Sequence, residues 1–265
     1  MYDNVIVPFD SSPSGRTALA PAGDLAWRCG GRVVIVTNTD ASDKASKAAI
    51  KSRAMSQSGS DADFWVDLEH SLGTALVEAA KFRTKPIICV SAKGKPGGLL
   101  KGKRWAVPSL VQEVLESSPV PVLVIGPETD TSRGLPMTEI VVSTDGSEDS
   151  EQILPLAAEW SRSMKLKFTL IGVASEKSET TRAESDYLSE RIAELRDRVP
   201  EARSELVRAS DPVEGLLRFM DDHEDAILAM STHGRTGGSG RSAIGSVAQQ
   251  VIARSKRAVL LRRPT

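Results

Sequence analysis

Glycine and hydroxyl residues concentrate in one loop near the end of the chain, where they could bind phosphate. The loop runs from Ser231 to Ser246. Its glycines are Gly234, Gly237, Gly238, Gly240 and Gly245. Glycine lets a backbone adopt positive φ and approach a ligand closely, and the first N–H groups of a helix that opens at Gly245-Ser246 have no intrahelical partners. Such N–H groups bind anions, so the loop predicts a cradle for phosphates.

The flanking elements bear on whether this loop binds anything. Residues 226–230 form a short apolar run typical of a strand buried on both faces. Apolar residues recur at helical spacing over 247–252, and residues 258–261 supply a second buried strand. A strand, a glycine loop, a helix and a strand are the nucleotide-binding arrangement of open α/β sheets, whose ligands lie at the carboxyl ends of the strands. The alternative is a surface loop that binds nothing.

The chain is an internal duplication. Residues 5–12 align with residues 140–147, and residues 109–114 align with residues 246–251. Between the halves, residues 126–136 are poor in apolar side chains and contain Gly and Pro, which is typical of a linker. We therefore expect a first domain over residues 1–127, a linker over residues 128–137 and a second domain over residues 138–265.

Strand and helix periods alternate through the second half. Strands are expected near residues 139–143, 167–173, 203–208, 225–231 and 258–262. Helices are expected near residues 149–164, 182–199, 212–222 and 246–255, and the first half repeats this order with a weaker second helix around residues 44–56. Five strands that alternate with helices predict an α/β fold in each half, with a parallel sheet and helices on both faces.

The composition argues against several classes of partner. With 34 Lys and Arg against 35 Asp and Glu, the net charge is −1, so nothing in the overall balance favours nucleic acid or an anionic membrane as a partner. No stretch could span a bilayer and the first residues lack the pattern of a signal peptide, so we expect a cytoplasmic protein. Cys29 and Cys89 have no histidines or further cysteines at metal-ligand spacing, and no metal site is expected from them.

Together, the duplication and the loop resemble the universal stress protein family in its tandem form, with two such domains in one chain. The family motifs are an Asp directly after the first strand, here Asp145, and a loop with the pattern Gly-x-x-Gly, nine residues, then Gly-Ser or Gly-Thr. This chain has Ser231 to Gly234, ten residues, and Gly245-Ser246, so it departs by one serine and one extra residue. The resemblance covers nearly the whole chain. It implies two tandem flavodoxin-like or adenine nucleotide alpha hydrolase-like domains and, in one branch of the family, bound ATP.

The resemblance also implies roles for the residues of the second-half site. Asp145 and Val173 would frame the adenine, with Ser143 and Thr144 near the ribose and base. The other nucleotide-binding residues would be Met230, Ser231, His233, Gly234, Arg235, Gly245, Ser246 and Val247. The backbone N–H groups of the loop and the Ser246 hydroxyl would bind phosphate oxygens.

Some of these roles have alternatives. Asp145 precedes a helix, where Asp-Gly-Ser is ordinary N-terminal capping chemistry, so it could cap that helix instead of, or as well as, binding a base. His233 could fix the loop or touch the ribose. Arg235 or Arg241 could add charge-assisted hydrogen bonds to phosphate or stay in solvent.

These residues favour binding over hydrolysis. Phosphoryl transfer needs an oriented nucleophile, a metal ion held by carboxylate or hydroxyl groups, and a group that stabilises charge. No acidic residue lies between Ser231 and Arg257. We therefore expect an ATP-binding stress-response protein with little or no catalysis, in which Mg²⁺ could accompany the triphosphate. The alternatives are a slow ATPase or phosphotransferase, and a nucleotide-free interaction scaffold.

The first half has a less complete version of the site. The matching positions are Pro8, Asp10, Ser91, Gly94 and Ser109. Pro108 replaces the closing glycine, and proline has no N–H to offer and blocks the close approach of a phosphate. Five basic residues between 93 and 104 could hold a phosphate by their side chains instead. The first half is therefore either a second nucleotide site or a degenerate half kept for pairing.

The resemblance implies how the two halves meet. The last strands of such domains pair across a two-fold axis, and a tandem chain can form this pair internally. Residues 122–124 would then lie beside residues 259–261. A homodimer of such chains is a further expectation.

Overall fold

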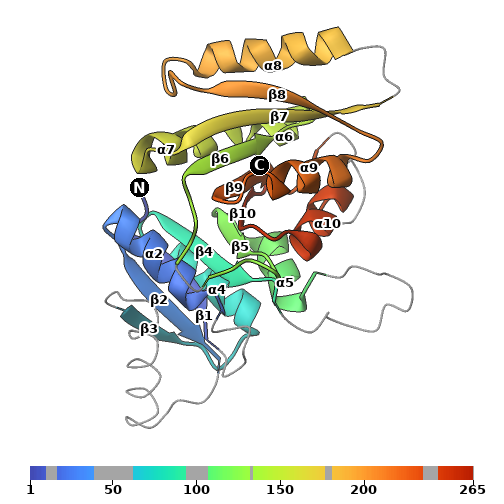
Figure 1. Cartoon of the computed structure of the whole chain (residues 1–265). Helices are drawn as coiled ribbons and strands as arrows, with labels where there is room; N and C mark the ends of the chain where they lie inside the picture. Colours follow the sequence, from blue (N-terminus) through green and yellow to red (C-terminus); the bar gives the residue numbers. More distant parts are fainter. Residues whose placement is uncertain are drawn as a thin grey trace, which may run out of the picture.

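The computed structural model describes residues 1–9, 17–38, 62–93, 107–131, 134–176, 181–234 and 244–264. The first half contains the strands β1 (Asn4–Pro8), β2 (Arg32–Thr37), β3 (Ala62–Val66), β4 (Pro86–Ser91) and β5 (Val122–Ile125), and the helices α2 (Leu19–Cys29), α4 (Leu72–Lys81) and α5 (Ser109–Ser117). The second half contains β6 (Glu139–Ser143), β7 (Lys167–Ser175), β8 (Arg203–Ala209), β9 (Ala226–Ser231) and β10 (Val259–Arg262), and the helices α6 (Glu148–Glu151), α7 (Leu154–Met164), α8 (Thr181–Leu195), α9 (Pro212–Asp221) and α10 (Ser246–Arg254). Figure 1 shows their arrangement.

These strands form one ten-stranded sheet, in the order β3-β2-β1-β4-β5-β10-β9-β6-β7-β8. Neighbouring strands are parallel except β5 and β10, which are antiparallel and join the two halves. In this pair Val124 lies opposite Val259, Leu123 opposite Leu260 and Val122 opposite Leu261. The expected pairing of residues 122–124 with residues 259–261 is confirmed, and so is the α/β fold with a parallel sheet in each half.

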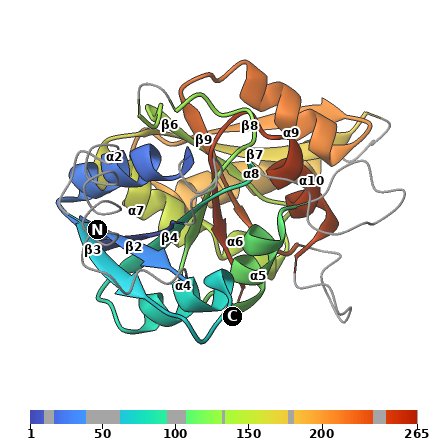
Figure 2. The ribbon, with the colours of Figure 1, turned by 90° about the horizontal axis from the view of Figure 1, so that it is seen from below.

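Helices cover both faces of the sheet because alternate side chains of each strand point to opposite faces. Val5 and Val7 of β1 belong to one apolar cluster, to which α2, α7 and α8 also contribute. Ile6, between them, belongs to the other cluster with α4, α5, α9 and α10. In Figure 2 the first-half strands accordingly lie between α2 and α4. None of the described helices is long and apolar enough to cross a lipid bilayer.

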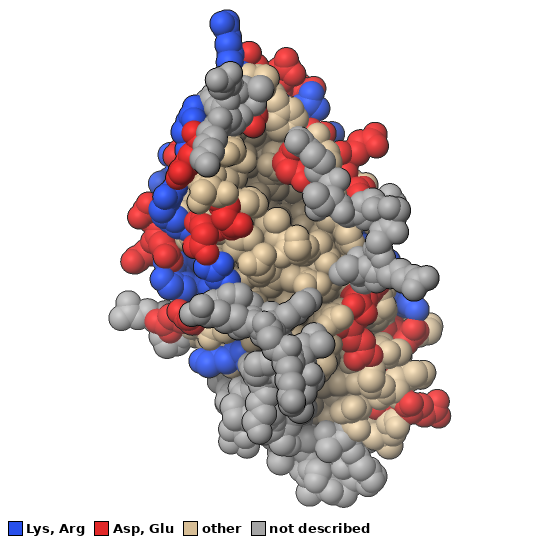
Figure 3. Space-filling model, turned by 90° about the vertical axis from the view of Figure 1, so that its right-hand side faces the viewer, with Lys and Arg blue, Asp and Glu red and all other residues tan. Residues whose placement is uncertain are grey.

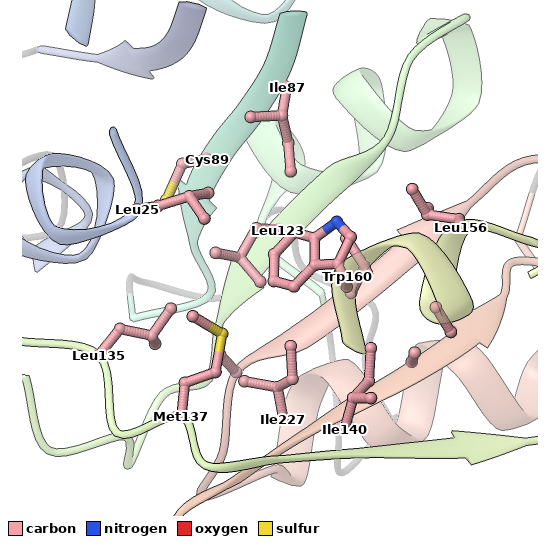
Figure 4. Packing of buried hydrophobic residues seen from close by; sticks show 14 of the residues in the cluster. Leu25, Ile87, Cys89, Leu123, Leu135, Met137, Ile140, Leu156, Trp160 and Ile227 are labelled. Atoms are coloured by element: carbon pink, nitrogen blue, oxygen red, sulfur yellow. The ribbon is translucent and has the colours of Figure 1, made fainter. Parts of the chain in front are cut away.

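The two halves share an apolar core around Trp160 of α7. Trp160 is fully buried, and its Nε1 donates a hydrogen bond of 2.9 Å to the hydroxyl of Tyr2. The two rings pack edge to face with their centroids 6.0 Å apart. Figure 4 shows Trp160 together with Leu123 of β5 and Ile227 of β9, which belong to the same cluster. Side chains from both halves therefore fill one continuous space.

The structure differs from the predicted elements at two helices of the second half. The helix expected near residues 182–199 is α8, which ends at Leu195. The single helix expected over residues 149–164 is two helices, α6 and α7, because Pro155 at the start of α7 lacks an N–H group and begins a new helix. The helix expected around residues 44–56 lies outside the described residues. The proposed domain limits at residues 127 and 138 stay a prediction.

Glu139, at the start of β6, is a carboxylate held by three partners. Its Oε1 accepts hydrogen bonds from Thr169 Oγ1 at 2.5 Å and Arg203 Nη2 at 2.9 Å, and its Oε2 lies 2.8 Å from His223 Nδ1. Burial alone would raise the pKa of Glu139, but hydrogen bonds from Thr169, His223 and Arg203 outweigh it and hold the pKa below its usual value. The ionised form is therefore the one that stabilises this edge of the sheet.

Replacing Glu139 by glutamine is expected to lower the free energy of unfolding at neutral pH and to matter less in acid. A carboxyl group whose pKa is lowered by folding adds stability above its unfolded-state pKa, here close to 4.5, and this stability is lost as the pH falls through the folded-state value. Urea unfolding from pH 7 down to pH 3 should therefore show the difference between the natural chain and E139Q shrinking below about pH 4.5. A difference that is constant over this range would contradict the assignment.

Candidate functional site

A cavity of about 250 Å³ opens at the carboxyl ends of β6, β7 and β9. It brings together residues from both ends of the second half: Ser143, Thr144, Asp145, Val173, Met230, Ser231, His233, Gly234, Gly245, Ser246 and Val247. These are all the residues predicted for the second-half site except Arg235, which lies outside the described residues. The side of the molecule at which β7 ends has a hollowed, largely uncharged surface (Figure 3).

Five further residues line the cavity that the sequence did not point to: Ser150, Pro212, Leu216, Thr232 and Ala248. Pro212 and Leu216 come from α9, which packs closely on β7 here: a Cβ added at Gly215 would lie 2.9 Å from Val173 Cγ1. A signal for this wall was present, because the turn between β8 and α9 falls at the same carboxyl edge as the other loops.

The two ends of the glycine loop are tied together by backbone hydrogen bonds. The N–H of Gly245 donates to the carbonyl of Thr232 at 2.7 Å, and the N–H of Thr232 donates to the carbonyl of Arg262 at 2.9 Å. Gly245 is the N-cap residue of α10, and no side chain of the described residues caps this helix. The first three residues of α10 all line the cavity. Their uncapped N–H groups make this edge suitable for an anion.

Asp145 also lines the cavity, and the turn that follows it holds its carboxylate in place. Its Oδ1 accepts hydrogen bonds from the N–H and the hydroxyl of Ser147, at 3.0 Å and 2.6 Å. The backbone of Gly234 approaches so closely that an added Cβ would collide with Asp145 Oδ2. The N-cap residue of α6 is Ser147, whose hydroxyl accepts from Ser150 N, so Asp145 does not cap this helix directly. Its carboxylate fixes the N-cap residue and also lies against the backbone of the glycine loop at Gly234.

His233 is placed at the start of the loop. Its Nδ1 lies 3.0 Å from Thr232 Oγ1, within hydrogen-bond distance. This contact is consistent with a role in fixing the loop, while a contact with a ribose stays a prediction.

The second half matches a known family. The model of the Universal stress protein family matches residues 137–263. The second half of the chain belongs to the universal stress protein family. The first half repeats the strand and helix order of the second half within the same sheet, so the chain has the tandem form.

Solved structures agree on the fold over the full length. A universal stress protein from Archaeoglobus fulgidus aligns over 99% of both chains, with 17% identity and a TM-score of 0.68. A putative universal stress protein from Pseudomonas aeruginosa aligns over 99% of this chain and 94% of its own, with 18% identity and a TM-score of 0.68. A universal stress protein in complex with cAMP aligns over 49% of this chain and 98% of its own, with 23% identity and a TM-score of 0.41. Among curated proteins, none matches this sequence.

The first half of the chain has a different arrangement at the matching place. Pro8 ends β1, and Ser91 ends β4, with its hydroxyl accepting from Lys93 N at 3.0 Å. Ser109 begins α5 directly after Pro108, which has no N–H group. The other two predicted residues, Asp10 and Gly94, lie outside the described residues.

Glu113 of α5 ties the first-half helices together. Its Oε1 accepts from the N–H and hydroxyl of Thr74, at 3.1 Å and 2.9 Å, and also from the hydroxyl of Ser71. A Cβ added at Gly73 would lie 2.5 Å from Glu113 Cδ. The carboxylate of Glu113 thus covers the N-terminus of α4, the helix that corresponds to α9 in the second half.

Proposed function

We propose that the second half binds ATP or a closely related adenine nucleotide, and that the protein is a nucleotide-dependent regulator with little or no catalysis. One observation carries this proposal. A single cavity combines an apolar wall, one oriented carboxylate and the uncapped N-terminus of α10. Apolar walls with a few placed polar groups are typical of small-molecule sites.

The base end of the cavity suits adenine. Val173, Leu216 and Met230 offer apolar surface to a flat ring. Asp145 adds an acceptor, because a carboxylate accepts hydrogen bonds and the 6-amino group of adenine donates them. Guanine held in the same orientation would present a carbonyl oxygen to the carboxylate, and its donors at N1–H and the 2-amino group would face away from it. We therefore expect adenine nucleotides to bind more tightly than guanine nucleotides.

The phosphate end lies at α10. The N–H groups of Ser246, Val247 and Ala248 begin the helix, and the partial positive charge of the helix N-terminus favours a phosphate. The Ser246 hydroxyl can donate a further hydrogen bond. Mg²⁺ could accompany the triphosphate, whose oxygens would be the ligands of the metal ion.

Catalysis has less support than binding. The described residues contain no group of three or more His, Cys, Asp or Glu side chains that could hold a metal ion. Asp145 Oδ1 already accepts two hydrogen bonds from Ser147, which hold the carboxylate in the orientation proposed for binding the base. A slow ATPase is the second candidate function. Nucleotide turnover that follows the protein through purification and disappears with a loop substitution would favour it.

The proposal is tested with the full chain. Nucleotide released from freshly denatured protein is identified by chromatography, and equilibrium dialysis then measures binding of ATP, ADP, GTP and cAMP to the nucleotide-free chain. We expect ATP in the released fraction and tighter binding of ATP than of GTP. Protein that carries no nucleotide and binds none at millimolar concentration would overturn the proposal in favour of a nucleotide-free scaffold.

We expect one nucleotide per chain. Pro108 takes the place of Gly245 at the start of α5, the helix that corresponds to α10. The proline ring opposes the close approach of a phosphate to the first N–H groups of this helix. Dialysis at saturating ATP should therefore give a ratio close to one. A ratio of two would show that the basic loop of the first half binds a second nucleotide.

A further inference from the structure

Helix α8 makes a direct contact with the rim of the cavity. In Figure 1 it lies along β8 and β7 at the outer margin of the sheet. Its Tyr187 reaches inward, and the phenol oxygen lies 3.2 Å from Thr144 Oγ1. Thr144 is buried and lines the cavity. A surface helix and the candidate site are therefore one hydrogen bond apart.

The direction of the hydrogen bonds in this contact can be worked out. Tyr187 donates its only hydroxyl proton to Glu151 Oε1 at 2.7 Å, since an ionised carboxylate can only accept. Burial raises the pKa of Tyr187 to about 12, so the phenol keeps this proton at neutral pH. The Tyr187 oxygen can then only accept from Thr144. The Thr144 proton is available for this when Ser150 Oγ donates to Thr144 Oγ1 at 2.8 Å, in place of the carbonyl of Ser147 at 2.9 Å. In that arrangement the order of donation is Ser150 to Thr144 to Tyr187 to Glu151.

The same threonine fixes the turn that carries Asp145. Thr144 Oγ1 accepts from the N–H of Gly146 at 3.1 Å and lies 2.8 Å from Ser150 Oγ. Ser150 Oγ in turn accepts from the N–H of Asp145 at 3.3 Å. The backbone on both sides of Asp145 is thus bonded to the two hydroxyl groups that connect it to α8.

Glu151 links α8 to this turn a second time. Its Oε2 lies 3.7 Å from Arg191 Nη1, one helical turn beyond Tyr187 on α8. The Arg191 guanidinium also lies 5.8 Å from the centre of the Tyr187 ring. These contacts are half-buried, so solvent screens them less than a surface ion pair.

We propose that α8 is coupled to occupancy of the cavity through Tyr187, which acts as a positioning residue for the turn 144–150. The proposal rests on the proposed function, because it takes the occupant to be an adenine nucleotide at Asp145. A nucleotide that orders the turn also orders α8, and a partner that moves α8 alters nucleotide affinity by the same factor. α8 is then the surface element that reports the state of the site.

Amide hydrogen exchange with and without saturating ATP tests this coupling. In the natural chain, ATP should slow exchange both in residues 226–234 and in residues 181–195. In Y187F, which keeps the ring and removes the hydroxyl, ATP should still protect residues 226–234 but no longer α8. Loss of one hydrogen bond at the turn should weaken ATP binding about threefold to tenfold. Ser189→Ala is the matched control, because Ser189 lies on the same helix and its hydroxyl donates to the carbonyl of Ser185 within that helix.

Each outcome decides between the proposals. Loss of the α8 response in Y187F but not in S189A supports the coupling, since a merely structural tyrosine would change exchange equally with and without ATP. An α8 response that survives in Y187F, or is missing in the natural chain although ATP protects residues 226–234, overturns the coupling and leaves the proposed function standing. Failure of the natural chain to bind ATP overturns both.

Discussion

Replacing Gly245 by valine is expected to abolish retention of ATP by the second half. A Cβ at this position would lie 3.1 Å from the carbonyl oxygen of Thr232, and the two methyl groups beyond it have to enter the cavity or displace the start of α10. Either movement would keep the phosphate of the proposed nucleotide away from the N–H groups of Ser246 and Val247. Two charge-assisted hydrogen bonds of roughly 1.5 kcal/mol each correspond to a loss of about 100-fold in affinity. Equilibrium dialysis with ATP measures this loss directly.

The control for this variant is another helix-capping glycine far from the cavity. Gly30 follows α2 with φ +66°, and a Cβ added there meets no atom within 4 Å. Gly30→Ala should cost about 1 kcal/mol of stability from backbone strain alone and leave ATP binding unchanged. If G245V still bound ATP like the natural chain, or if G30A lost ATP to the same extent, the site would not lie at the start of α10.

Much of the site could be predicted because its parts are local in sequence. Gly245, Ser246 and Val247 follow one another at a helix start, and Asp145 follows a strand directly, so each short pattern indicates both its element and its position at the sheet edge. The duplication then assigned the same order to both halves. The cavity lining brings these short patterns together without any long-range information having been used.

The parts that could not be predicted depend on contacts between distant segments. The turn before α9 is expected at the carboxyl edge of the sheet, but the packing of α9 on β7 decides that Pro212 and Leu216 are the side chains that reach the cavity. Tyr187 is separated from Thr144 by 43 positions, and nothing in the sequence of α8 indicates that Tyr187 bonds to the turn.

The break between α6 and α7, in contrast, could have been predicted from Pro155, because proline in an otherwise helical pattern ends or restarts a helix.

The antiparallel contact of β5 with β10 raises a question about how independent the two halves are. Each half has the strand order of a complete unit, yet Trp160 of the second half lies in a cluster with Leu123 and Tyr2 of the first. When both halves share an apolar core, unfolding of either half exposes apolar side chains of the other. The chain should therefore unfold as one cooperative unit, although its sequence is a duplication.

Replacing Trp160 by alanine tests this inference and should have a large effect on stability. The side chain is fully buried, and its removal leaves a cavity between the halves and frees the hydroxyl of Tyr2 from its hydrogen bond. Truncation of a buried aromatic residue costs about 3–5 kcal/mol. For a chain of this size that loss lowers the melting temperature by roughly 10 °C. Calorimetry should show one transition in the natural chain and one transition at lower temperature in W160A.

Trp27 offers the matched control, since it is the same residue type on a helix of the first half but is 77% exposed. Trp27→Ala should change the unfolding free energy by no more than about 0.5 kcal/mol. The informative result is the shape of the W160A transition. If the two halves were independent units that merely touch, W160A would lower the melting of the second half alone and split the curve in two. A single shifted transition would mean that nucleotide bound at the second-half cavity stabilises the first half as well, because ligand binding to the folded state stabilises the whole cooperative unit.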